Sequence, residues 1–104
     1  MHCFTDAMIN VGLYYRVKRG HEAEFESIFG EVVEHLKGTA SGIRDAKLYK
    51  QIGGSSEYMI YTDWEDMESF KKFVQSSEFH STTQKGREII DGMPRHRIFR
   101  EETA

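Results

Sequence analysis

The chain has 104 residues, of which 38% are hydrophobic and 30% are charged, and its formal net charge is −3. This length suits one domain, and this composition is typical of a folded, soluble protein rather than a disordered one. The single cysteine excludes an intramolecular disulfide and a cysteine-rich zinc site, and the negative charge argues against a general nucleic-acid binder.

No apolar run approaches the roughly 20 residues that cross a bilayer, and the N-terminal residues are unlike a signal peptide. We therefore expect a cytoplasmic protein without membrane or nucleic-acid partners. Residues 1–7 lack regular patterning and are expected to form an N-terminal extension, followed by a single domain over residues 8–104.

The first predicted element is a strand over residues 8–18, because apolar and polar residues alternate there. Its apolar face carries Ile9, Val11, Leu13, Tyr15 and Val17. Its other face carries Asn10, Gly12, Tyr14 and Arg16. The next segment, over residues 22–37, has apolar residues at spacings of three and four, which predicts an amphipathic helix that ends at Gly38.

Residues 42–52 and 57–64 are predicted strands, and the short turn at residues 53–56 makes them an antiparallel hairpin. A second helical stripe follows over residues 67–74, and Ser76 and Ser77 can cap another helix. Residues 91–94 form a stop signal, because glycine and proline continue neither a helix nor a ladder. Residues 95–100 are the last predicted strand.

This order predicts an α+β fold on the ferredoxin-like, split βαβ plan: a four-stranded antiparallel sheet with helices on one face. The helix-free face would expose Tyr14 together with either Tyr49 or Tyr61. Such an apolar patch is costly to leave in water, so we expect a homodimer that pairs through this face. His96, which alternates with Ile98 on the last strand, is expected to point into that interface.

Three segments resemble the antibiotic-biosynthesis monooxygenase domain family: Val17 to Phe25, Ser41-Gly42, and Tyr61 to Phe70, which is continued by Phe73 to Phe79. The resemblance covers about residues 9–100. It implies a dimeric α+β barrel whose members include quinone-forming monooxygenases, haem-degrading enzymes and proteins without a known reaction. It also implies that no cofactor is required, because in this family the substrate itself, an electron-rich phenol or haem, activates oxygen.

Haem degradation in this family uses an asparagine, a tryptophan and an iron-binding histidine. The resemblance implies that the positions of these three residues correspond, in this order, to Leu13, Phe73 and Thr83. All three residues differ, which disfavours a haem oxygenase of that type. Residues 79–87 and 93–97 resemble archaeal members, including those fused to chlorite-dismutase-like haem proteins. Haem therefore remains a candidate substrate or ligand.

The candidate catalytic residue is His80, which could act as an acid–base group or an iron ligand from a turn beside the family's histidine position. The alternative is a solvent-exposed helix histidine. The candidate substrate-binding residues are Leu13, Phe73, Phe79, Thr83 and Arg87. Arg87 could clamp a carboxylate or phenolate, or pair with Asp91 instead. No pair of histidines has the spacing of a helical metal site, so no metal is expected.

These features predict a cofactor-independent monooxygenase, an oxidoreductase that acts on a small hydrophobic aromatic or porphyrin ligand between the sheet and the helices. The alternative is a non-catalytic protein of the same fold that binds haem or another hydrophobic ligand. The sequence carries no glycine-rich phosphate loop and no flavin or nicotinamide fingerprint.

Overall fold

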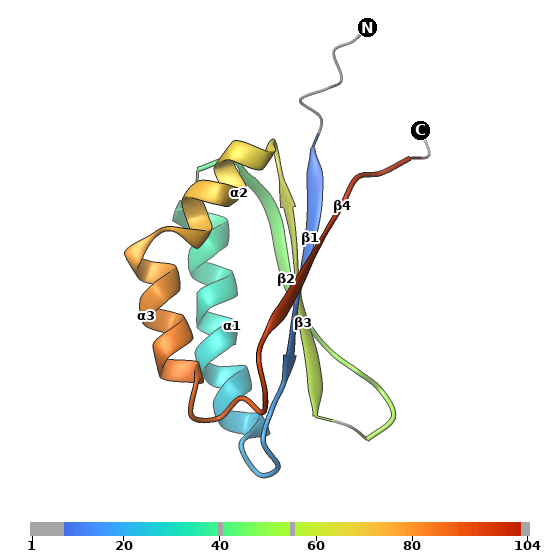
Figure 1. Cartoon of the computed structure of the whole chain (residues 1–104), viewed down its shortest axis with the longest axis vertical. Helices are drawn as coiled ribbons and strands as arrows, with labels where there is room; N and C mark the ends of the chain where they lie inside the picture. The colour runs from blue at the N-terminus through green and yellow to red at the C-terminus, as the bar shows by residue number, and fades with distance from the viewer. Residues whose placement is uncertain (1–7, 40, 55, 103–104) are drawn as a thin grey trace, which may run out of the picture.

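The computed structural model describes residues 8–39, 41–54 and 56–102, and the predicted extension at residues 1–7 lies outside these ranges (Figure 1). The elements are β1 (Ile9–Arg16), α1 (Glu22–Thr39), β2 (Ile43–Lys50), β3 (Glu57–Trp64), α2 (Met67–Val74), α3 (Ser77–Gly86) and β4 (Arg95–Phe99). This order confirms the α+β, ferredoxin-like fold.

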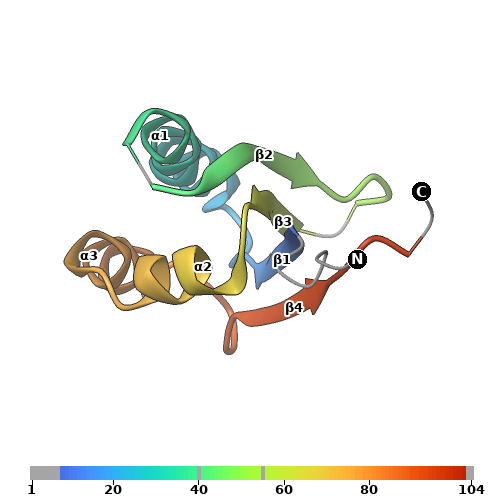
Figure 2. The ribbon, with the colours of Figure 1, turned by 90° about the horizontal axis from the view of Figure 1, so that it is seen from above.

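The strands form one antiparallel sheet in the order β2-β3-β1-β4. Seen from above, all helices lie on one side of this sheet (Figure 2). β1 is shorter than predicted, because Val17 does not continue the pairing of β1 with its neighbouring strands. The Val17 N–H donates to the carbonyl of Ser56 at 2.8 Å, and Val17 forms only an isolated bridge with Ile90. β4 is an edge strand, and each of its residues is exposed.

Side-chain caps fix where the two short helices begin. The Asp66 carboxylate accepts a hydrogen bond from the Ser69 N–H at 2.8 Å and starts α2. The Ser76 hydroxyl accepts from the Phe79 N–H at 3.1 Å and starts α3 directly after α2. Each cap satisfies an N–H group that the helix itself leaves without a partner. The two caps therefore turn the chain so that α3 runs beside α1.

The core lies between the helices and one face of the sheet. The face predicted for the first strand is confirmed, because each of its apolar residues is buried: Ile9, Val11, Leu13, Tyr15 and Val17. Phe25 and Phe29 of α1 pack on this face with stacked rings whose centroids are 4.3 Å apart. Within the described residues, no helix is long and apolar enough to span a membrane.

The helix-free face carries three tyrosines, since the strand register places Tyr14, Tyr49 and Tyr61 on the same side of the sheet. The sequence predicted only one of Tyr49 and Tyr61 on this face, whereas both lie there. Asn10 lies beside them and donates hydrogen bonds to the Tyr61 hydroxyl at 3.0 Å and to Asp63. The Asp63 carboxylate beside the Tyr61 hydroxyl, together with burial, raises the pKa of Tyr61 to about 12.

The prediction for His96 was wrong. The β1–β4 register pairs His96 with Leu13, which faces the helices. Directly opposed residues of an antiparallel pair point to the same face, so His96 lies on the helix side. Its ring centroid is 6.2 Å from that of Phe70 in α2.

Candidate functional site

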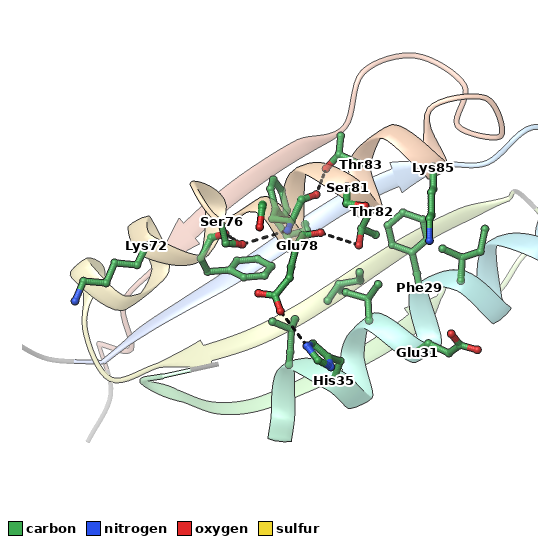
Figure 3. Close-up of a pocket in the computed structure, with 18 of the residues that line it drawn as sticks. Phe29, Glu31, His35, Lys72, Ser76, Glu78, Ser81, Thr82, Thr83 and Lys85 are labelled. Atoms are coloured by element: carbon green, nitrogen blue, oxygen red, sulfur yellow. Dashed lines mark hydrogen bonds and ion pairs between the residues drawn. The ribbon is translucent and has the colours of Figure 1, made fainter. Parts of the chain in front are cut away.

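A pocket of about 910 Å³ lies between the helices and the helix-facing side of the sheet. The sheet contributes residues from β1 and β3, α1 forms one wall, and α2 with α3 forms the other (Figure 3). This volume falls in the range of pockets that bind small organic ligands.

The interior of the pocket is mainly apolar and aromatic. Its apolar lining residues are Leu13, Tyr15, Ile28, Phe29, Val32, Leu36, Ile60, Trp64, Phe73 and Phe79. Trp64 is fully buried, and its Nε1 donates to the Thr62 Oγ1 at 2.8 Å, so its ring is held at the pocket. The Phe73 ring packs 5.4 Å from the Trp64 ring and 4.9 Å from the Phe79 ring, between centroids. Flat aromatic ligands match such a lining.

Polar side chains form the rim. The His35 Nε2 of α1 lies 3.3 Å from the Glu78 Oε2 of α3, so this pair joins the two walls (Figure 3). Lys72, Lys85 and Glu31 also line the pocket. The side chains of His35 and Glu78 are 56% and 72% exposed, so water screens the pair and its contribution to stability is small.

Tyr15 lines the pocket from β1 and is the buried titratable side chain of its interior. Its ring lies 5.5 Å from that of Phe25 and 5.2 Å from that of Phe29, between centroids. Burial among these rings raises the pKa of Tyr15 to about 12, because the phenolate would lose its hydration. At neutral pH this side chain is therefore a neutral phenol.

The structure brings together four of the six side chains proposed from the sequence. Leu13, Phe73, Phe79 and Thr83 line the pocket, and these include all three positions that the family resemblance singled out. The Thr83 hydroxyl already donates to the Phe79 carbonyl at 2.8 Å, so its proton is not available to a ligand.

His80 and Arg87 are not among the lining residues, and both are exposed. The catalytic role of His80 therefore remains a prediction. The expected ion pair between Arg87 and Asp91 is absent within the described ranges. Arg87 instead continues the last turn of α3 and donates its N–H to the Gln84 carbonyl at 3.3 Å.

Sequence reasoning missed His35, Glu78 and Tyr15. Val32 follows Ile28 by four positions and His35 follows Val32 by three, so His35 lies at the edge of the apolar stripe of α1. This spacing could have indicated that His35 lies beside the pocket. Tyr15 was placed correctly on the buried face but was counted as core. Glu78 could not be paired with His35 before the packing of α3 on α1 was known.

The lining fits a flat apolar molecule better than an iron-ligated haem. Of the described lining residues, His35 is the one histidine, and it is held on the rim by Glu78. In the part of the chain that the structure describes, no three His, Cys, Asp or Glu side chains come together as a metal site would need. The pocket thus offers a porphyrin a surface to pack on but no imidazole in its interior.

The model of the family described as "Antibiotic biosynthesis monooxygenase" matches residues 8–85. The chain belongs to this family. A protein of Natronomonas pharaonis named "Putative heme-binding protein" is 29% identical over 86 residues, which cover 83% of this chain. The chain spans only 14% of the length of that relative.

Two solved structures show how widely this fold is shared. A conserved protein from Methanosarcina mazei superposes with a TM-score of 0.84 at 20% identity, over 93% of this chain and 95% of that one. SnoaB, a cofactor-independent oxygenase from Streptomyces nogalater, superposes with a TM-score of 0.80 at 18% identity, over 93% of this chain and 95% of that one. At this identity the likeness establishes the fold alone.

Proposed function

We propose that the chain is a cofactor-independent monooxygenase that acts on a small hydrophobic aromatic or porphyrin ligand in the pocket between the sheet and the helices. The observation that carries this proposal is the aromatic lining of the 910 Å³ pocket, in which Trp64, Phe73 and Phe79 lie side by side. Membership of the monooxygenase family agrees with it.

In such a reaction the substrate supplies the electrons. An electron-rich phenol transfers them to O₂, one oxygen atom enters the ring as the carbonyl of a quinone, and the other leaves as water. The residues of this chain would hold the ring flat against Trp64 and Phe73 and exclude bulk water from it. A dry, oriented complex favours reaction with dissolved O₂ over competing proton and solvent reactions.

The second candidate is a non-catalytic protein that binds haem or another hydrophobic ligand. The name of the Natronomonas relative favours it, as does the replacement of the family's haem-degrading residues by Leu13, Phe73 and Thr83. In this case the pocket would pack on a porphyrin plane without catalysing its oxidation.

A haem titration separates the two candidates. Wild-type protein is titrated with haem, the Soret band is followed, and ascorbate is then added under oxygen. Bleaching supports turnover, and a stable shifted band supports carriage. With no shift, the protein is next given electron-rich phenols, and oxygen uptake with quinone absorbance is measured. No oxygen uptake with any phenol, together with no haem binding, would contradict the monooxygenase and would exclude haem as the ligand of the second candidate.

We also propose that two copies pair through the helix-free face and that the protein works in the cytoplasm. Tyr49 and Phe99 on this face are 45% and 48% exposed. A hollow of about 680 Å³ is lined by Tyr49 together with Tyr14, Met59 and Arg97. A second copy would cover these rings, and a stable pair buries about 1,600 Å² in total.

A further inference from the structure

The Tyr15 hydroxyl differs from the other buried polar groups of the core. The Tyr58 hydroxyl donates to the Glu26 carboxylate at 2.5 Å. The Trp64 Nε1 donates to the Thr62 Oγ1, which itself donates to the Val11 carbonyl. Tyr15 is only 9% exposed, yet in the described ranges its hydroxyl has no hydrogen-bond partner.

The position of Tyr15 places its side chain at the wall of the pocket. Tyr15 pairs with Tyr58 across β1 and β3, so its side chain lies on the helix-facing side of the sheet. It lines the pocket two residues after Leu13. The neighbouring rings of Phe25 and Phe29 hold the phenol ring in place, so the hydroxyl is presented in a fixed position.

Buried polar groups are almost always hydrogen-bonded, and an unpaired one costs free energy. A group that stays unpaired at the wall of a pocket therefore needs an explanation beyond folding. We propose that the Tyr15 hydroxyl donates a hydrogen bond to the bound ligand, which is an aromatic molecule with an acceptor oxygen such as a ketone, quinone or phenolate. This inference rests on the proposed function, because it requires an aromatic ligand in the pocket.

The protonation state allows the hydrogen bond to run in this direction. Burial raises the pKa of Tyr15 to about 12, so at neutral pH the phenol keeps its proton and can donate a hydrogen bond. Of the described lining residues, the carboxylates Glu31 and Glu78 are both exposed, and Glu78 contacts His35. The interior therefore offers a donor to the ligand and no anion, so a ligand with an acceptor oxygen is preferred over a cationic one.

The test compares two bicyclic probes that differ in one oxygen atom. 1-Tetralone carries a ketone beside its aromatic ring, and tetralin is the same bicycle without the ketone. Trp64 is the single tryptophan of the chain and lines the pocket, so its fluorescence reports binding. In Tyr15→Phe we expect the affinity for 1-tetralone to fall about three- to tenfold, the effect of one hydrogen bond. The affinity for tetralin should stay within about twofold.

Tyr58→Phe is the matched control, because it removes a hydroxyl from the same face of the core that is bonded to Glu26 and does not line the pocket. We expect it to lower the melting temperature and leave both affinities unchanged. Tyr15→Phe should keep or raise the melting temperature, because its hydroxyl bonds none of the residues that the structure describes. A drop as large as that of Tyr58→Phe would overturn the inference, since it would reveal a partner within the protein.

The outcomes also separate this inference from the proposed function. If wild-type protein binds both probes and Tyr15→Phe changes neither affinity, or weakens both equally, the inference is overturned while the aromatic pocket stands. If wild-type protein binds neither probe, the aromatic pocket itself is contradicted, and the role of Tyr15 falls with it.

Discussion

Gly86 of α3 packs directly against the ring of Phe29 in α1, so closely that an added Cβ would lie 2.8 Å from the Phe29 Cζ. Phe29 is in turn fixed by its contact with Tyr15. Toward the other end of α3, Glu78 meets His35 of the same helix α1. The two walls of the pocket are therefore held by a steric contact at one end of α3 and by an exposed polar pair near the other.

Gly86→Ala should destabilise the protein. The added methyl group would overlap the Phe29 ring, and overpacking of this kind costs about 1–3 kcal/mol. The higher helix propensity of alanine offsets about 1 kcal/mol. We expect a net loss of up to about 2 kcal/mol and a melting temperature lower by several degrees, measured by thermal unfolding followed by circular dichroism.

Gly30→Ala is the control for this change. Gly30 also lies in a helix, α1, but among the described residues its added Cβ would have no neighbour within 4 Å. Only the helix propensity then changes, so we expect a gain of about 0.5–1 kcal/mol. Equal effects of the two variants would show that Gly86 is not needed for the contact between α1 and α3.

His35→Ala and His80→Ala together decide which imidazole serves the pocket. His35 lines the pocket, whereas His80 is exposed outside it. We expect His35→Ala to change haem affinity or the Soret position, and His80→Ala to leave both unaltered. Both melting temperatures should stay close to wild type, because the His35–Glu78 pair is largely exposed. Loss of binding in His80→Ala alone would support the role that the sequence predicted for it.

The fold could be predicted because each of its elements has a local signal. The alternation from Ile9 to Tyr15 and the stripe from Phe25 to Leu36 arise from burial on one face, and burial is visible in the pattern of a single element. The same alternation placed Leu13 on the pocket side. The error at His96 arose because that face was inferred without the register of β4 against β1.

The rim of the pocket depends on how one helix lies on another, which no single element encodes. His35 and Glu78 are 43 positions apart in the chain, and they meet where α3 packs on α1, with Gly86 against the Phe29 ring. That the Tyr15 hydroxyl has no partner among the described residues is likewise a property of the assembled core. A sequence can indicate that Tyr15 is buried, but not whether a partner atom lies within reach.

Alkaline pH should destabilise the folded protein partly through Tyr15. Well below pH 10 its phenol is protonated in both states, so the full stability is present. As the pH rises from 10 toward 12, the unfolded chain loses the proton while the folded chain keeps it, and stability falls. At pH 11 this difference amounts to about 1.4 kcal/mol for a pKa shift from 10 to 12.

Tyr15→Phe removes this contribution, so its free energy of unfolding should decline less between pH 9 and pH 11 than that of the wild type. Urea unfolding at several pH values measures the difference. Tyr61, whose pKa is also raised to about 12, remains in both proteins and affects them equally. Parallel curves for the wild type and the variant would show that Tyr15 titrates alike in the folded and unfolded chains.

Sedimentation tests the pairing of two copies through the helix-free face. We expect wild-type protein to sediment as a dimer at micromolar concentration. Tyr49→Glu should shift it to a monomer, because Tyr49 is 45% exposed on this face and a buried carboxylate without a partner is costly. Met67→Glu is the control: Met67 is 36% exposed but lies on α2, on the opposite side of the sheet, so this variant should remain a dimer.

Circular dichroism checks that both variants fold. A wild-type monomer, or equal dissociation of both variants, would rule out an interface on this face, and Tyr14, Tyr49 and Tyr61 would then need another partner.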